Sequence, residues 1–529
     1  MADLVTFVLI GLYFIVLIGI GNWASKKIHN TEDYILAGRS LGFWVFTILI
    51  ICSICSGMTL LGVSGFGYNS GWPGIWEQIF VPLAASFCLI FFGVKLNAIG
   101  KKRGYLTIQD YLAERFESPR ALRALSAVSG IVVSLIYLIG QYAAISIVLV
   151  WLFGIPHWQA LLIAGVIITA YTVVGGLYAV SWTTLFQGGI LILGVLLMAP
   201  PVIMSAGGLE HINTVLAGVD TNFVEPWYPS PAYASYAYAT PEFLVSFGIL
   251  LMVGLACAPH VINNVLAAKE TRYFKWAPLV AFGIYAVVMF LVKFVGFAVR
   301  SLVEEGALIL PDAVNAQDYS FIAGVEHAMP SVALWALFAV IVLAAVMSTT
   351  DRLMLTVGTS FAWDIYKNIL RPSATDKEVL LVSKVAIVLG AGGTLLLAIN
   401  PPEMLAWLIW MGIGVMLATF AVPLLAGLYW RGATGEGAIA SMATGLVAAG
   451  AFGYWHQFVA PLPVHFSLYA LVLSLLTMIV VSLMTARNSG DVLDATWTGW
   501  FIQSPTPVPR AGGTGEAWAA DRDAPRQHR

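Results

Sequence analysis

The chain has 529 residues, of which 59% are hydrophobic and only 10% are charged, and its mean hydropathy is +0.86. Soluble domains carry about 25% charged residues, so this composition excludes an ordinary water-soluble enzyme. The formal net charge of −2 excludes nucleic acid as an expected partner, because binding a polyanion needs an excess of basic residues. The sequence therefore predicts a multi-pass protein of the cell (plasma or inner) membrane, with the lipid bilayer as its surroundings.

Apolar segments of roughly twenty residues, the length that crosses a bilayer core about 30 Å thick, recur along the whole chain. They predict an all-α polytopic membrane protein. The first segment has neither a basic region before it nor a small-residue cleavage site after it, so we expect a retained helix rather than a signal peptide. The expected spans are 4–23, 42–70, 74–96, 124–152, 158–178, 185–204, 243–267, 276–300, 331–361, 379–399, 404–428, 434–455 and 465–486.

The basic residues distinguish the two sides of the membrane, because cytoplasmic loops carry an excess of Lys and Arg. With the N-terminus outside, all but three of the 26 Lys and Arg residues fall in the inner loops or the C-terminal tail. The exceptions are Lys293, Arg300 and Arg352. A missed or extra span would invert every later loop and destroy this asymmetry. We therefore predict thirteen transmembrane helices, with the N-terminus out and the C-terminus in.

The segments between the spans are too short for a folded catalytic module. The outer segments 205–242 and 301–330 carry carboxylates and no Lys or Arg. Solvated loops explain this most simply, and the alternative is an outer vestibule that attracts cations. The tail 488–529 is rich in Pro, Gly and Ala with mixed charge, which predicts a mostly disordered cytoplasmic segment.

All four cysteines lie in apolar segments. The spacing of Cys52 and Cys55 is also found in redox and zinc pairs, but no second pair of Cys or His completes a ligand set. We interpret these cysteines as small residues inside the membrane. No nucleophile–base or metal-ligand spacing appears elsewhere, so we do not expect an enzyme.

The segment 51–57 reads Ile-Cys-Ser-Ile-Cys-Ser-Gly, and Gly62, Ser64, Gly65 and Gly67 follow it. Small residues at this depth let helices pack closely. The same composition suits a helix that unwinds, in which freed carbonyls coordinate a cation and freed N–H groups meet an anionic substrate. Irregular backbone inside a membrane is tolerated only where it lines a cavity or is buried in protein.

A second polar segment, Ser348-Thr349-Thr350, lies in the middle of the apolar span 331–361. Hydroxyls in a helix often bond to the carbonyl one turn earlier. Hydroxyls and carbonyls are also the oxygen ligands that hard cations take. Considered with the segment 51–57, this pair of hydroxyls makes a cation site plausible.

Several motifs resemble the sodium:solute symporter family, in order and over about residues 5–487. One part of the sequence is similar to the pantothenate branch of this family. It consists of Pro401-Pro402-Glu403-Met404, Gly427 to Arg431, Gly437-Ala438 and Ser441-Met442. The motifs are Cys52-x-x-Cys55-Ser56-Gly57 with Gly62-x-x-Gly65, Gly175-Gly176-Leu177-Tyr178-Ala179-Val180 with Gln187, Pro259-His260 leading to Lys269, and Ala344 to Thr349 leading to Asp364-Ile365-Tyr366.

The resemblance implies a core of two inverted five-helix repeats, which would be residues 42–204 and 243–428. An extra first helix and a cytoplasmic loop would occupy 1–41, and the segment 205–242 would be an extracellular loop. Two peripheral helices would occupy 429–487, before the tail.

The resemblance also implies a sodium site between the broken first helix of repeat one and the third helix of repeat two. Carried over to this chain, the ligands are the carbonyls of Cys52, Cys55 and Ala345 and the hydroxyls of Ser348 and Thr349. Sodium is the only metal ion and the only cofactor that we expect.

Substrate would lie beside the ion, at the unwound segment. Our candidates are Ser56, Thr59, Gln78 and Gln141; the two glutamines are polar residues in apolar spans, where they need partners. The alternative is that such residues only hold helices together. Asp351, which follows the hydroxyls, is a candidate for a role in coupling or cation release.

Three positions depart from the family pattern. Many members carry an acidic residue, associated with a second cation or with coupling, where this chain has Thr184, which argues against a second sodium site there. Proline-type members have Asp in place of Ile54, which weakens a proline assignment. Asn264 stands where an Arg often occurs.

We therefore predict a secondary active transporter that couples sodium entry to uptake of a small polar solute by alternating access. Freed N–H groups favour a carboxylate: a pantothenate-like acid, then another monocarboxylate, then an amino acid. The alternatives are an uncoupled or proton-coupled facilitator of the same fold, or a transporter-like membrane sensor with a separate signalling partner. A small membrane accessory subunit is left open as a further partner.

Overall fold

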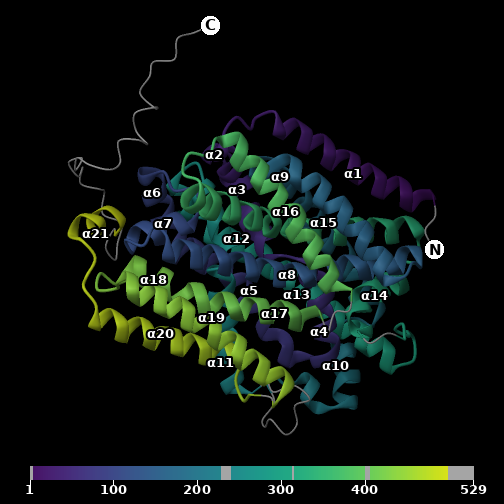
Figure 1. Cartoon of the computed structure of the whole chain (residues 1–529). Helices are drawn as coiled ribbons and strands as arrows, with labels where there is room; N and C mark the ends of the chain where they lie inside the picture. The colour runs from purple at the N-terminus through teal and green to yellow at the C-terminus, as the bar shows by residue number, and fades with distance from the viewer. Residues whose placement is uncertain (1–3, 228–239, 313–314, 400–404, 461, 498–529) are drawn as a thin grey trace.

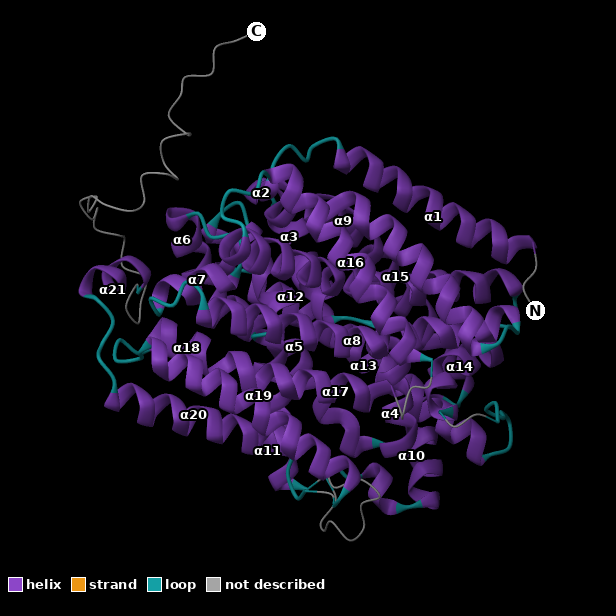
Figure 2. Ribbon diagram, in the orientation of Figure 1, coloured by secondary structure: helices purple, strands orange, loops and turns teal. Residues whose placement is uncertain are grey.

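The computed structural model describes residues 4–227, 240–312, 315–399, 405–460 and 462–497 (Figure 1). These residues form helices and no β-strand, as the expected all-α class requires (Figure 2). Only one isolated β-bridge occurs among them, between Leu41 and Ala268. The fold is therefore an all-helical polytopic bundle.

Ten helices among the described residues are long and apolar enough to cross a membrane, and two bent helix pairs raise that number to twelve. The long helices are Leu4–Ser25, Trp72–Arg103, Ala121–Phe153, Gly176–Ser205, Ala277–Glu304, Val332–Leu370, Asp376–Ala398, Ile409–Tyr429, Gly435–Phe458 and Phe466–Met484.

The prediction of thirteen spans differs from this number at one place. The predicted spans 158–178 and 185–204 fall in α9 (His157–Ser205), where two helices meet at a kink with no polar loop between them. Gly176 leaves the helical region there, with φ 50° and ψ −167°, and a Cβ at this position would lie 2.4 Å from the Tyr34 ring. The part before this kink contains only a shorter apolar helix, His157–Ala170.

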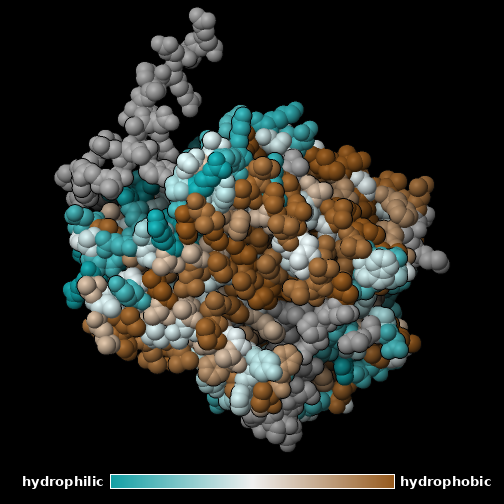
Figure 3. All heavy atoms as spheres, viewed as in Figure 1, coloured by the Kyte–Doolittle hydropathy of each residue, from teal (hydrophilic) through white to brown (hydrophobic). Residues whose placement is uncertain are grey.

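The outside of the bundle is apolar, as contact with lipid requires. Helix α1 (Leu4–Ser25) lies along one edge, packs on α9 and α15 (Val332–Thr359), and exposes most of its large hydrophobic side chains (Figure 1). Hydrophobic residues cover most of the face in Figure 3, and hydrophilic residues gather toward the two ends of the helices. This distribution fits a protein that spans a bilayer.

Two helix pairs of the bundle are bent at a short break. The first consists of α3 (Phe43–Ile54) and the continuous helix Met58–Ser70, made of η2 (Met58–Gly62) and α4 (Val63–Ser70), at 61°. The second consists of α11 (Pro241–Ile249) with η8 (Leu250–Gly254), followed by α12 (Pro259–Ile262) with η9 (Asn263–Ala267), at 43°.

Long helices surround these breaks. Helix α15 packs against α9 and α8 (Ala121–Phe153), and α13 (Ala277–Glu304) packs against α4, α5 (Glu77–Phe87) and α9. The remaining helices of eight or more residues are α6 (Val94–Arg103), α7 (Ile108–Arg115), α10 (Gly208–Val219), α14 (Ser320–Ala328), α16 (Asp376–Ala398), α17 (Leu405–Met416), α18 (Val422–Tyr429), α19 (Gly435–Phe458) and α20 (Phe466–Met484).

The segments outside the spans contain more structure than their composition predicts. The segment 205–242 includes helix α10, and the tail begins with a helix, α21 (Gly490–Thr496). This start of the tail is attached to the bundle, because Asn488 Nδ2 donates to the Arg115 carbonyl (3.2 Å) and Arg431 pairs with Asp494 (2.9 Å). Residues 498–529, and the Pro401–Met404 part of the pantothenate-like stretch, lie outside the described residues.

Candidate functional site

The first helix break is stabilised by side chains rather than by proline. The Ser56 N–H donates to Thr59 Oγ1 (3.0 Å), and the Met58 N–H donates to Ser56 Oγ (3.2 Å). The Gly57 N–H donates to Gln141 Oε1 on α8 (3.2 Å). These oxygens accept hydrogen bonds from the first N–H groups of the helix Met58–Ser70 and from the two residues before it. The N–H groups at a helix N-terminus need such partners because they have none within the helix.

The same break frees two carbonyls at the end of α3. In a continuous helix the Cys52 and Cys55 carbonyls would accept from residues 56 and 59. Here the Ser56 N–H bonds to the Thr59 hydroxyl, and the Thr59 N–H bonds to the Ser56 carbonyl (2.9 Å). Both cysteine carbonyls are thus released from the helix ladder inside the protein.

Helix α15 supplies the partner for these carbonyls. Thr349 Oγ1 lies 2.9 Å from the Cys52 carbonyl oxygen and 2.7 Å from that of Cys55. A hydroxyl has one proton and therefore donates to one carbonyl at a time. The preceding residue on α15 is Ser348, and its hydroxyl donates to the Ala345 carbonyl about one turn earlier (2.9 Å).

The five sodium-ligand candidates thus form two adjacent groups of neutral oxygens. Cys52, Cys55 and Thr349 are in direct contact, and Ala345 and Ser348 contact each other on the same helix. All five are at most 1% exposed. Buried oxygens without a formal charge suit a monovalent hard cation, which carbonyl and hydroxyl oxygens can coordinate.

Close packing at Gly57 brings three helices together. A Cβ on Gly57 would lie 2.6 Å from Cβ of Ala144 on α8 and 2.7 Å from Cγ2 of Val346 on α15. Real Cβ atoms do not approach other atoms so closely, so only glycine lets both helices reach the broken segment.

Three of the four substrate candidates lie at this break. Ser56 and Thr59 cap it, and Gln141 holds the Gly57 N–H. Gln78 does not join them: with its amide oriented to bond, Nε2 donates to the carbonyls of Gly74 (3.0 Å) and Ile75 (3.1 Å) in its own turn. Gln78 therefore holds a local turn, whereas the alternative left open by the sequence was that it ties two helices together.

Asp351 is buried between α15 and α9. Its Oδ1 accepts a hydrogen bond from Thr172 Oγ1 on α9 (2.7 Å), and its exposure is 0%. The structure thus gives this carboxylate a partner between α15 and α9.

Three aromatic residues at the break were not among the candidates. The Tyr285 hydroxyl on α13 lies 3.0 Å from Thr59 Oγ1, and the Tyr137 ring on α8 stacks on His260 at 5.5 Å. Tyr137 and Gln141 are four residues apart and so share a face of α8, and His260 directly follows Pro259. The spacing of Tyr137 from Gln141 and the position of His260 next to Pro259 were the sequence features that could have identified these two residues.

Two of these polar groups retain unused hydrogen-bonding atoms. Gln141 Nε2 and both ring nitrogens of His260 are buried and have no hydrogen-bond partner among the described residues. Buried polar atoms without partners are costly. An acceptor oxygen of a solute would satisfy the Gln141 amide N–H and the one N–H of a neutral His260 ring, whose other nitrogen accepts.

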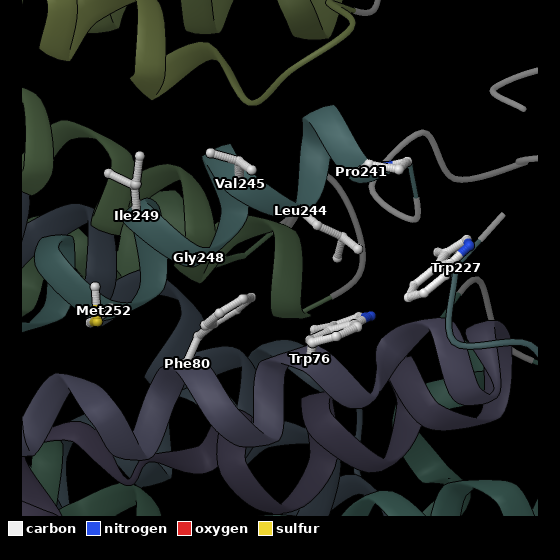
Figure 4. Close-up of a pocket in the computed structure, with 9 residues that line it drawn as sticks. All are labelled: Trp76, Phe80, Trp227, Pro241, Leu244, Val245, Gly248, Ile249 and Met252. Atoms are coloured by element: carbon white, nitrogen blue, oxygen red, sulfur yellow. The ribbon is translucent and has the colours of Figure 1, made fainter. Parts of the chain in front are cut away.

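A separate apolar pocket of about 520 Å³ lies between α5 and the α11–η8 helix (Figure 4). Figure 4 shows Trp76 and Phe80 facing Leu244 across it. It has no charged lining side chain and no place for a polar solute. It is lined by Trp76, Phe80, Trp227, Pro241, Leu244, Val245, Gly248, Ile249 and Met252.

The model of the sodium:solute symporter family matches residues 34–445. The chain belongs to the sodium:solute symporter family. Membership confirms the resemblance predicted from the motifs, and it makes the protein a sodium-coupled solute symporter of the membrane and not an enzyme. Sodium is a co-substrate of this family, which corrects its description as a cofactor.

Relatives of this symporter have different substrates in their names. The chain is 27% identical over 490 residues to the sodium/pantothenate symporter of Escherichia coli (strain K12), covering 92% of this chain and 96% of the relative. It is 26% identical over 508 residues to the sodium/proline symporter of Haemophilus influenzae (strain ATCC 51907 / DSM 11121 / KW20 / Rd), covering 93% and 96%.

The fold of this symporter resembles two solved transporters. A Na⁺-coupled sialic acid symporter in a substrate-bound outward-open state aligns with a TM-score of 0.73 at 16% identity, covering 92% of this chain and 99% of that chain. Mhp1, a nucleobase-cation-symport-1 family transporter, aligns with a TM-score of 0.54 at 16% identity, covering 88% and 99%.

Proposed function

We propose that this symporter takes up a small carboxylate-bearing solute across the cell membrane, by alternating access. The observation that supports this best is the pair of freed carbonyls on Cys52 and Cys55, held by the hydroxyl of Thr349. A sodium ion can take the place of the hydroxyl proton, because it needs the same oxygens. Its binding then joins α3 to α15.

The proposed ion site uses all five candidates. The carbonyls of Cys52, Cys55 and Ala345 and the hydroxyls of Ser348 and Thr349 coordinate sodium, and Thr349 turns its proton away so that a lone pair faces the ion. In the proposed organisation, 42–204 and 243–428 are inverted repeats, so the ion links one repeat to the other.

The proposed solute site lies on the other side of the break. Gln141 Nε2 and the His260 ring nitrogens are buried atoms that a carboxylate could engage. Ser56, Thr59, Tyr285 and Tyr137 complete the polar and aromatic surroundings. Because ion and solute share the segment Cys55–Gly57, ordering it with one favours binding of the other, by the same factor in both directions.

The order of preference among solutes is a pantothenate-like acid, another monocarboxylate and an amino acid. The relatives named for pantothenate and proline both transport molecules with a carboxylate. A neutral sugar offers these donors only hydroxyl oxygens, which make weaker hydrogen bonds than an ionised carboxylate.

The test is transport by the purified protein in proteoliposomes. Labelled pantothenate, proline, pyruvate, acetate and glucose are supplied under an inward sodium gradient, then under potassium or a proton gradient. We expect sodium-dependent accumulation of one carboxylate above its equilibrium level. Accumulation of glucose alone would overturn the solute class, and equilibration without gradient dependence would overturn the ion site.

A further inference from the structure

A buried guanidinium lies next to the proposed sodium site. Arg352, on α15, is 2% exposed and reaches between α3 and α9. Its Nε donates to Ser53 Oγ (2.8 Å), its Nη1 to the Ser348 carbonyl (2.8 Å) and its Nη2 to Thr184 Oγ1 (3.1 Å). Three different helices thus supply one oxygen each.

The oxygens around this guanidinium are those of a cation site. Two hydroxyls and one backbone carbonyl, all neutral and buried, accept hydrogen bonds from the guanidinium. This is the donor chemistry proposed for sodium one helix turn away. Here the cation is part of an arginine side chain, and its planar guanidinium group donates hydrogen bonds to several oxygens at once.

Ser348 belongs to both sites. Its hydroxyl is a proposed sodium ligand, and its carbonyl accepts the bond from Arg352 Nη1. Ser53 connects the same network to the second broken helix, because Asn264 Nδ2 donates to Ser53 Oγ (2.9 Å) and to the His260 carbonyl (2.8 Å). Through these bonds the guanidinium is connected to the ion site at the first break and to the second broken helix.

We propose that Arg352 acts as a tethered cation that permanently fills a second cation position, bounded by Ser53, Thr184 and Ser348, so that the symporter binds one sodium ion. The inference rests on the proposed sodium site, because Ser348 defines the boundary between the two positions. A mobile ion cannot enter a position that a fixed positive charge already holds, since like charges at contact distance in a buried site repel strongly.

The tethered cation also positions Ser348. By holding the carbonyl of this residue, the guanidinium fixes the backbone that carries the proposed ligand hydroxyl. Unlike an ion, it does not leave during transport. The energy for the cycle then comes from one sodium ion per turnover.

The test counts sodium ions on the purified full-length protein by equilibrium binding of ²²Na⁺, with no solute present. The wild-type chain should bind one sodium ion. The double variant R352S/T184D removes the guanidinium and adds a carboxylate, and it should bind two. Two controls should stay at one: T184D, whose carboxylate pairs with Arg352, and R352K, which keeps the charge.

Each outcome supports or overturns the proposal. Two ions on the wild-type chain, or one ion on a monodisperse double variant, would overturn it. If the double variant does not fold, R352Q/T184D, which keeps more of the side-chain volume, takes its place: two ions are expected, and one ion would overturn the proposal. Absence of any saturable sodium binding to the wild-type chain would instead overturn the proposed sodium site, so the two failures are distinguishable.

Discussion

The two helix breaks of this symporter are held open by different means. The second follows from one residue: Pro259 has no N–H, and it moves Ala258 to an extended ψ of 129°. The first contains no proline, and Cys55 reaches a ψ of 117° only because Ser56, Thr59 and Gln141 hold the freed N–H groups.

This difference separates a permanent break from an adjustable one. A proline break stays open whatever surrounds it. The carbonyls of Cys52 and Cys55 are held by the hydroxyl of Thr349, which an ion can replace with little movement. We therefore expect ion coupling to act on the first break and hardly at all on the second.

The largest effect should follow from filling the space at Gly57. In G57A the new Cβ meets Ala144 and Val346 at 2.6 and 2.7 Å, so α8 or α15 must move away from the break. Overpacking of this kind costs about 1–3 kcal/mol, and displaced ligands should lower the transport rate about 100-fold. The matched control is G392A in α16, where a Cβ meets nothing within 4 Å. Equal rates in both variants would contradict the close approach.

Removing the hydroxyl that bridges the carbonyls should act on sodium. In T349A we expect the sodium concentration for half-maximal transport to rise about tenfold or more, since losing a partner of buried polar groups costs about 1–3 kcal/mol. The solute KM at saturating sodium should change far less. T350A is the control, because Thr350 Oγ1 bonds only within its own helix, to the Val346 carbonyl (2.8 Å). Equal losses of sodium and solute affinity in T349A would count against the proposed site.

The two glutamines should differ when each is replaced by leucine. Q141L removes the acceptor of the Gly57 N–H, and we expect the solute KM to rise roughly tenfold. Q78L disrupts only the turn at Gly74 and Ile75, so its KM should stay close to the wild-type value. Initial uptake rates at saturating sodium give both values. A larger effect in Q78L would restore Gln78 as a solute ligand.

The smallest effect on sodium should come from the proline break. P259A restores an N–H to the second helix pair but touches none of the five proposed ligands. Because the second break reaches the ion site only indirectly, through the bond from Asn264 to Ser53, the sodium activation constant should change far less than in T349A. A tenfold change in that constant would show that the ion also depends on the second break.

Local sequence was sufficient for the helical architecture. Apolar length predicted twelve of the spans because crossing a bilayer depends on the composition of each segment by itself. The kink at Gly176 was missed, since the close approach of Tyr34 that accompanies it comes from another part of the chain. The same is true of the attached start of the tail, where Asn488 bonds to a residue 373 positions away.

For the candidate site, too, some features could be predicted from the sequence and others only from the tertiary structure. The Cys-Ser-Gly segment and the Ser-Thr pair, together with the family resemblance, were enough to name the atoms that a cation needs, because backbone carbonyls and hydroxyls are intrinsic to those residues. Only the tertiary structure brought Thr349 to a carbonyl 294 positions away. It alone separated Gln141 from Gln78 and gave Arg352 its oxygen partners. Hydropathy and spacing are properties of neighbours in sequence, whereas these contacts depend on how distant helices pack.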